Sequence, residues 1–293
     1  MIRRQFVKAS LLSGPILLGK PINSGLNERS SYRSIKLSLN AYSFNDKLRS
    51  AETNLFELID YCKAQGFDAI DPTGYYFPGY PNVPDDKFIN DFKRHAFLSG
   101  IEISGTGVRN DFANASSQKR AEDLKLIEAW CAVASKLGAP LLRVFPGKEI
   151  KDGRNKHDVI KQVVNELKSA CEISEKYGIM LALQNHNEFL LSSEEISEVI
   201  EGVNSGWLGL HLDIGSLAFR DPYEEIERLI QYAITWQIKE KVWVKGEKVT
   251  VDYNRLMDII LQSDYVGYLP LETLNSDPEI NLPVMINAIR ELL

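Results

Sequence analysis

The sequence has few of the residues on which disulfide, thiolate and membrane proteins depend. It holds three cysteines and four histidines among 293 residues. Cys62, Cys131 and Cys171 are far apart, and each lies in a stretch with helical periodicity. We therefore expect buried free thiols rather than a zinc site or a catalytic cysteine. No apolar run reaches the ~18–20 residues of a membrane helix, so we also expect no membrane span.

Beyond the first thirty residues, acidic side chains outnumber basic ones. The formal net charge is −6, yet residues 1–30 hold five basic side chains against one acidic side chain. The excess of acid is therefore concentrated in the rest of the chain. An acidic surface repels a phosphate backbone, so we predict that nucleic acid is not a partner and that the ligand is a small molecule.

The first thirty residues have the pattern of an export signal. Arg3 and Arg4 precede Phe6, and an apolar stretch ends at Leu18. A charged region followed by an apolar region is typical of a signal peptide, and the arginine pair resembles the twin-arginine signal. A basic amphipathic first helix is the alternative. We predict that residues 1–30 are a signal and lead-in and that the protein is periplasmic.

From residue 36 onward, short apolar strands alternate with amphipathic helices, and several helices end at a glycine directly before a strand. This alternation predicts a parallel sheet. A doubly wound open sheet is the alternative, but it usually carries a glycine-rich phosphate loop after its first strand, and residues 40–44 contain no glycine. The predicted strands are 36–41, 67–71, 101–105, 140–145, 179–184, 208–213, 234–239 and 267–272; the predicted helices are 52–65, 86–99, 117–137, 155–177, 193–203, 223–230, 254–262 and 281–292.

Eight such units are the number that closes a barrel. A (β/α)8 barrel needs about 250 residues, so we predict that residues 31–293 form a single α/β domain, a (β/α)8 TIM barrel. The loop 73–84, rich in Tyr, Pro and Gly, is expected to form an ordered lid or rim.

Polar side chains lie where the predicted strands end, which is where barrel enzymes place their active sites. A carboxylate at a strand end can instead cap a helix or pair with arginine, and for Asp71 both roles stay open. Asp213 and Glu272 each close an apolar strand, and burying an acid there without a cation or donor is costly. The expected substrate-binding residues are Asn40, Tyr42, Asp71, Arg109, Arg143 and Asn185.

Four residues are candidates for proton transfer or charge stabilisation. Glu272, His186 and Glu240 could move a proton, because each lies at or near a predicted strand end. A desolvated Lys239 could act as an acid or an electrophile. Its alternative is a surface lysine in a run of charged residues.

Four of these stretches resemble the xylose-isomerase-like barrel superfamily, which includes sugar isomerases, sugar-phosphate epimerases and inosose dehydratases. The resemblance covers residues 36–293 and is carried by residues 181–186, 210–215, 236–240 and 268–272. It implies a carbohydrate substrate and one divalent metal, held by Glu, Asp, His and Glu from strands five to eight. The matching positions are Gln184, Asp213, Gln237 and Glu272.

Two of the four matching positions depart from the family pattern. Gln184 stands where Glu is usual, and Gln237 stands where His is usual. Amide oxygens can coordinate a hard cation but bring no charge. Two carboxylates and two amides therefore favour Mg, Mn or Ca over zinc, and we expect Mn or Mg, bound more weakly than in relatives.

The leading hypothesis is a sugar or keto-sugar isomerase or epimerase that abstracts a proton next to a carbonyl, with a metal or Lys239 stabilising the enediolate. Export argues against a sugar phosphate as substrate. Two alternatives stay open: a lyase that eliminates the leaving group of an oxidised (keto) glycoside, and a non-catalytic carbohydrate-binding barrel. The acidic body and the leader disfavour a DNA-repair endonuclease of similar fold. An oligomer is possible.

Overall fold

The computed structural model describes residues 35–186, 188–218, 220–274 and 277–293, so the predicted signal lies outside the described residues. The strands are β1 (Ile35–Asn40), β2 (Ala69–Asp71), β3 (Glu102–Ile103), β4 (Thr106–Gly107), β5 (Leu141–Val144), β6 (Met180–Gln184), β7 (Leu208–Asp213), β8 (Ala233–Lys239), β9 (Lys241–Val244), β10 (Glu247–Thr250) and β11 (Gly267–Glu272). The α-helices are α1 (Asn45–Arg49), α2 (Leu55–Gln65), α3 (Asp86–Ser99), α4 (Ser117–Leu137), α5 (Lys156–Glu175), α6 (Ser193–Val203), α7 (Pro222–Leu229), α8 (Tyr253–Gln262) and α9 (Pro278–Arg290).

Nine parallel strands form one sheet in the order β3-β2-β1-β11-β8-β7-β6-β5-β4. The two strands at its ends, β3 and β4, are halves of one broken strand, because β3 pairs with β2 and β4 pairs with β5. A further bridge joins Thr73 to Gly107 across the break. The sheet is therefore a nearly closed barrel, and the prediction of a single (β/α)8 TIM barrel is confirmed.

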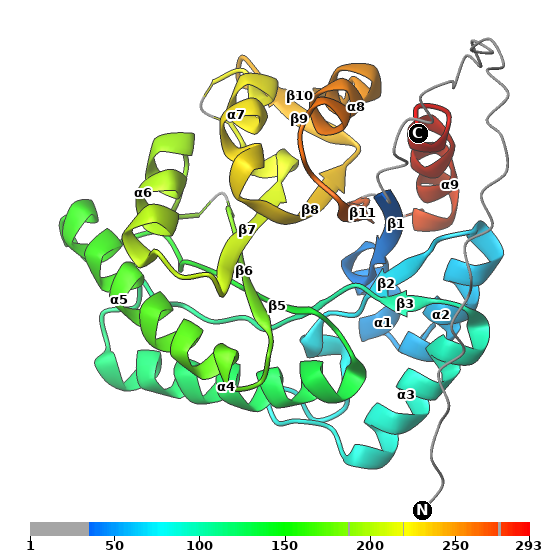
Figure 1. The fold of residues 1–293 in the computed structure, drawn as a ribbon, viewed down its shortest axis with the longest axis horizontal. Coiled ribbons are helices and arrows are strands. Elements are labelled where there is room, and N and C mark those ends of the chain that lie inside the picture. The colour runs from blue at the N-terminus through cyan, green and yellow to red at the C-terminus, as the bar shows by residue number, and fades with distance from the viewer. Residues whose placement is uncertain (1–34, 187, 219, 275–276) are drawn as a thin grey trace, which may run out of the picture. The chain divides into compact units, whose positions relative to one another are not determined.

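Helices surround the sheet as expected for this fold (Figure 1). Each predicted helix overlaps an observed one, and α2, α3 and α4 end at Gly66, Gly100 and Gly138 in the left-handed conformation. The apolar residues of the strands and of the inner helix faces form one buried core. The three cysteines are free and buried within it, as expected. Among the described residues, no helix is long and apolar enough to cross a membrane.

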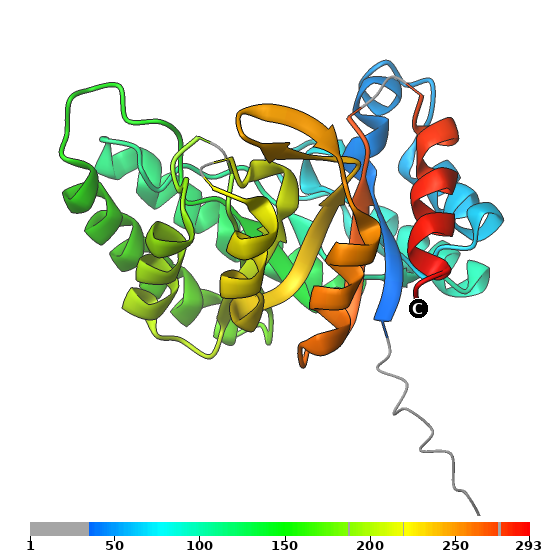
Figure 2. The ribbon, with the colours of Figure 1, turned by 90° about the horizontal axis from the view of Figure 1, so that it is seen from above.

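One element lies outside the predicted pattern. The chain after β8 forms an antiparallel hairpin, β9–β10, where the sequence analysis placed only a connection between strand seven and its helix. Its turn uses Lys245 and Gly246, both with positive φ (51° and 84°), as a two-residue hairpin turn requires. Figure 2 shows the hairpin at the end of the barrel opposite to the start of β1. It therefore lies at the carboxyl ends of the strands.

The inside of the barrel is unusually polar toward that same end. Because side chains alternate along a strand, every second residue of a barrel strand points inward. On β8 the apolar Trp236 and Ile238 are buried in the core, while Gln237 between them bonds to side chains of neighbouring strands. Ser38 on β1 and Ser104, which lies in the break between β3 and β4, share a hydrogen bond of 2.7 Å. This inward polar set leads into the candidate site.

Candidate active site

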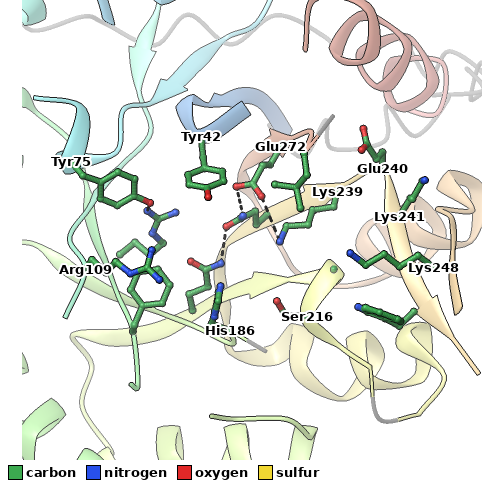
Figure 3. A pocket seen from close by; sticks show the side chains of 17 residues that line it. Tyr42, Tyr75, Arg109, His186, Ser216, Lys239, Glu240, Lys241, Lys248 and Glu272 are labelled. Atoms are coloured by element: carbon green, nitrogen blue, oxygen red, sulfur yellow. Dashed lines mark hydrogen bonds and ion pairs between the residues drawn. The ribbon is translucent and has the colours of Figure 1, made fainter. Parts of the chain in front are cut away.

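A cavity of about 380 Å3 opens at the carboxyl ends of the strands. A volume of this size suits a small molecule. Its lining combines buried polar groups at the bottom with aromatic and basic side chains around the mouth, as Figure 3 shows. The location agrees with the sequence-based expectation for a barrel enzyme.

Five polar side chains at the bottom of the cavity form one hydrogen-bonded network, which we call the floor cluster. Gln184 Nε2 donates to Asp213 Oδ2 and to Gln237 Oε1, each at 2.9 Å. Gln237 Nε2 donates to the Glu272 carboxylate. The members of the floor cluster are Gln184, Asp213, Gln237, Lys239 and Glu272. All four positions matched to metal ligands in the sequence are therefore brought together.

Strand register explains why these side chains meet. Asp213 on β7 is paired with Gln237 on β8, and Glu272 on β11 is paired with Lys239 on β8. Because Gln237 and Lys239 are two residues apart on one strand, they point to the same face. A shift by one residue would turn both to the helix side.

Lys239 completes the floor cluster as its only cation. Its Nζ lies 3.0 Å from Asp213 Oδ2 and 3.5 Å from Glu272 Oε1, and its side chain is 14% exposed. Burial by itself would lower the pKa of Lys239, but the two carboxylates raise it well above its ordinary value. The amine is therefore a stable ammonium and is a poor nucleophile at neutral pH.

The two carboxylates differ in their surroundings. Asp213 also accepts from Ser216 Oγ at 2.9 Å and from the backbone N–H of Gly215 at 3.0 Å. Burial opposes its charge, yet Lys239 and these donors hold the pKa of Asp213 below its ordinary value. Burial instead dominates at Glu272 and raises its pKa, with Lys239 only partly offsetting it. Asp213 is thus a fixed anion, and Glu272 is the better proton acceptor.

Gly215 makes room for Lys239. A Cβ at position 215 would overlap Cδ of Lys239. The lysine stem therefore lies against the backbone at the turn that follows β7. Gly107 serves Arg143 in the same way, because its Cβ would lie 2.9 Å from Arg143 Nε.

Arg143 is the second buried cation at the cavity. It projects from β5, lies near the buried Asp71, and donates from Nη2 to Tyr75 Oη at 2.9 Å. Its guanidinium lies over the Phe145 ring, 5.4 Å from the centroid. Burial raises the pKa of Asp71, and Arg143 opposes that shift. Asp71 thus faces Arg143, and it does not line the cavity.

Two further predicted proton carriers line the cavity in different ways. His186 packs edge-on against Phe145, and its Nδ1 lies 3.5 Å from Glu188 Oε2. Burial lowers the pKa of His186, which favours the neutral ring. Glu240 accepts from Thr273 Oγ1 at 2.5 Å, and Figure 3 shows its carboxylate turned away from Lys239 and Glu272. Glu240 is therefore held by Thr273, whereas His186 Nδ1 has no hydrogen-bond partner among the described residues.

The mouth of the cavity is formed by six side chains that we call the rim: Tyr42, Tyr75, Arg109, Lys241, Trp243 and Lys248. The hairpin β9–β10 supplies three of them, with Lys248 Nζ lying 5.0 Å from the centre of the Trp243 ring. The loop 73–84 supplies Tyr75 and is held in place, because the Tyr80 hydroxyl accepts from the Arg109 backbone N–H.

The remaining predicted substrate-binding residues are buried and do not line the cavity. Asn40 Oδ1 caps the turn after β1 through Tyr42 N. Asn185 exchanges two hydrogen bonds with the backbone of Asp213, at 2.9 and 2.8 Å. Their assignment to substrate binding stays a prediction, as does that of Asp71. Tyr42, Arg109 and Arg143 do line the cavity.

Sequence reasoning missed the contributions of Trp243, Lys248 and Ser216. The alternation of residues 241–250 around Lys245-Gly246 is a hairpin signal that would have pointed to the first two. Ser216 follows Asp213 by three residues, but its contact depends on the short turn between them. No single-residue signal in the sequence marks it.

Residues 59–292 match the protein family described as the xylose isomerase-like TIM barrel. The chain belongs to this family. The match spans most of the barrel, including every member of the floor cluster. No curated protein sequence is significantly similar to the chain.

Solved structures of the same fold are similar to the chain over most of its length. The IolI protein with a bound zinc atom has a TM-score of 0.72 at 17% identity, covering 88% of this chain and 96% of its own. The 3-keto-D-glucoside 4-epimerase from E. coli has a TM-score of 0.70 at 14% identity, with 88% and 99% coverage. A protein described as the probable 3-DHS dehydratase from Bacillus anthracis has 0.70 at 15%, with 87% and 98% coverage. At these identities the likeness shows the fold.

The floor cluster does not suit a divalent metal ion as it is arranged. Both amides turn their NH2 groups toward the carboxylates, and a metal needs oxygen lone pairs instead. The Lys239 ammonium already lies between Asp213 and Glu272. Among the residues that the structure describes, no group of three or more His, Cys, Asp or Glu side chains lies together as a metal site. That this chain binds Mn or Mg stays a prediction.

Proposed function

We propose that the protein is a sugar or keto-sugar isomerase or epimerase that abstracts a proton next to a carbonyl group. The observation that carries this proposal is the ammonium of Lys239, held between Asp213 and Glu272 at the bottom of the cavity. Membership of the xylose isomerase-like family supports a carbohydrate substrate. One solved neighbour is named a keto-glucoside epimerase.

In this scheme the substrate carbonyl oxygen points at Lys239. Loss of the neighbouring proton moves the C–H electron pair into a C=C bond and places negative charge on that oxygen. A fixed ammonium stabilises this charge, and the stabilisation is much larger in a nearly dry site than in water. Asp213 keeps the lysine charged and in place.

Glu272 is the residue that we assign to proton abstraction. Its raised pKa makes it a stronger base than an ordinary glutamate. It lies on β11, directly beside Lys239 in the strand register. One group would therefore hold the oxygen while its neighbour takes the proton from the adjacent carbon.

His186 is the second proton carrier in this proposal. It reaches the cavity from the segment after β6, and its lowered pKa leaves the ring neutral near pH 7. A neutral imidazole can both give and accept a proton. Isomerisation returns a proton to the neighbouring carbon, whereas epimerisation returns one to the same carbon from the opposite face. We assign this return to His186, which lines the cavity.

Elimination is the second candidate reaction. If the substrate is an oxidised glycoside, the same enediolate can expel a leaving group at the β-carbon instead of being reprotonated. This alternative is supported by two solved neighbours, one named a keto-glucoside epimerase and the other a probable dehydratase. The two reactions share the first step, so one assay tests both.

The assay is exchange of the α-proton of keto-sugars and 3-keto-glycosides into D2O, followed by NMR. We expect exchange with at least one substrate by the wild type, lost in Glu272→Gln and retained in a control, Glu247→Gln, on the hairpin away from the floor cluster. Product analysis of the active substrate then separates epimer, isomer and eliminated product. Tight binding of keto-sugars with no exchange would instead favour the non-catalytic carbohydrate-binding barrel.

We further propose that the protein acts after export through a twin-arginine signal. The pair Arg3-Arg4 ahead of Phe6 supports this. Replacing both arginines with lysine should leave the protein in the cytoplasmic fraction, whereas Arg29→Lys should be exported as the wild type is. Equal export of all three forms would rule the proposal out.

A further inference from the structure

We propose that Lys239 is a tethered replacement for a divalent cation, so that the floor cluster works without a metal. This inference rests on the proposed function for its chemistry, but its geometry stands independently. The ammonium contacts the two carboxylates that the family resemblance assigns to a metal, at 3.0 and 3.5 Å.

Charge balance is the first argument. With Glu at position 184 and His at 237, three carboxylates would face a dication, which leaves one negative charge in excess. In this chain, Gln184 removes one carboxylate, and a single ammonium faces the remaining two. The excess is again one negative charge. The change from Glu to Gln and the presence of Lys239 therefore compensate for each other.

Amide orientation is the second argument. Gln237 Oε1 accepts from Gln184 Nε2 at 2.9 Å and faces His211 Nε2 at 3.1 Å. Turning either amide over would set an oxygen against a carboxylate. The amides therefore hold the carboxylates as donors, which is the opposite of what a metal ligand does.

Space is the third argument. The Lys239 stem lies where a side chain at position 215 would be, and only glycine leaves that room. Ser216, next in the chain, fills a further acceptor position on Asp213. The turn after β7 thus accommodates the lysine and leaves Asp213 with four donors in all. Three of them are on Oδ2, so a metal ion bound at that oxygen would have to displace at least one donor.

The experiment compares three proteins by elemental analysis and by thermal unfolding with Mn2+, Mg2+, Zn2+ or EDTA. The wild type should hold no divalent ion, and its Tm should not change. The triple variant Q184E/Q237H/K239M restores the acidic set without the ammonium. It should bind about one ion per chain and gain roughly 5–10 °C in Tm at an ion concentration about 100 times Kd.

The double variant Q184E/Q237H is the matched control for the lysine. Because Lys239 still lies between the carboxylates, it should need a higher ion concentration for the same Tm gain than the triple variant. Equal affinity in the two variants would overturn the proposal, as would near-stoichiometric metal in the wild type. If circular dichroism shows that the triple variant does not fold, the metal content of the wild type decides alone. No bound metal supports the proposal, and near-stoichiometric metal overturns it.

These readouts do not depend on turnover. A metal-free wild type that exchanges no keto-sugar proton would sink the proposed function while leaving the lysine replacement standing. A metal-bound wild type that does exchange protons would sink the lysine replacement and leave the proposed function standing. Proton exchange by the wild type in EDTA tests both proposals at once. If both hold, we expect its rate to stay within about twofold of the rate without EDTA.

Discussion

The floor cluster and the rim of the same cavity differ in how their charges are neutralised. In the floor cluster, Lys239 is paired with Asp213 and Glu272, and all three are largely buried. At the rim, Arg109, Lys241 and Lys248 form no ion pair with any described residue, and they lie next to solvent and aromatic rings. One region is preorganised and the other is adaptable.

This difference assigns separate tasks to the two regions. A buried group that several hydrogen bonds hold in one position can stabilise charge as that charge develops. A solvated cation or an exposed aromatic ring contributes to binding alike in the ground state and the transition state. Changes to the floor cluster should therefore lower kcat, and changes to the rim should mainly raise KM.

The largest effect is expected from Lys239→Met. It removes the oxygen-stabilising ammonium, which we expect to cost about 10²–10³ in kcat, and it leaves two buried carboxylates unpaired, which costs about 3–5 kcal/mol of stability. Proton exchange and urea unfolding measure the two losses. Lys239→Arg keeps the charge and should recover most of the stability. Unchanged stability in Lys239→Met would mean that the buried pairing does not exist.

Glu272→Gln should separate activity from stability. We expect kcat to fall by about 10²–10⁴. Its folded-state pKa lies above the ordinary value of 4.5 because of burial, so the unfolded chain releases this proton first, and folding stability falls as pH rises through that window. The variant avoids this loss, so it should be as stable as the wild type at pH 7 or more stable, with the difference vanishing below pH 4.5.

Asp213→Asn is the matched control with the opposite sign. The pKa of Asp213 is held below 3.8 by Lys239 and the surrounding donors, against the effect of burial. It therefore contributes stability above pH 3.8 that is lost as pH falls through its folded-state pKa. Asp213→Asn should be less stable than the wild type at pH 7. If both variants shift stability in the same direction, the assigned asymmetry between the two carboxylates is wrong.

Gly215→Ala tests the floor cluster without replacing any of its members. The added methyl group overlaps the Lys239 stem, so the ammonium must move. A misplacement of about 1 Å can cost roughly 10²-fold in rate. Gly206→Ala is the control, because a Cβ there meets no atom within 4 Å. Similar kcat values for the two variants would show that the position of the lysine is not critical.

The two regions also differ in how far the sequence predicts them. The alternation of strands and helices predicted the barrel, because period and turn residues are local signals. The floor cluster was found from strand ends at Asp213 and Glu272, since register brings parallel strand ends together. The contacts of Lys239 with Asp213 and Glu272 could not be predicted, because the charged run 239–241 is equally typical of a solvent-exposed segment. Only the packing against Gly215 decides between these readings.

The rim was the harder region for sequence reasoning. Its hairpin follows β8 after a single residue and was read as a connection. Exposed side chains such as Lys248 carry no burial pattern, and their position over the cavity depends on the path of the whole hairpin. Tyr75 belongs to the loop 73–84 that the sequence predicts to be a lid or rim, but its bond to Arg143 joins residues 68 positions apart.

The smallest effect is expected from Trp243→Ala at the rim. The ring lines the cavity and is covered on one face by Lys248. Loss of one aromatic contact costs about 0.5–1.5 kcal/mol, so KM should rise by roughly 2- to 12-fold while kcat stays unchanged. Lys245→Ala, at the hairpin turn and outside the cavity lining, is the control. If Trp243→Ala lowers kcat as strongly as it raises KM, the hairpin takes part in positioning the reacting atoms, and the division between floor cluster and rim does not hold.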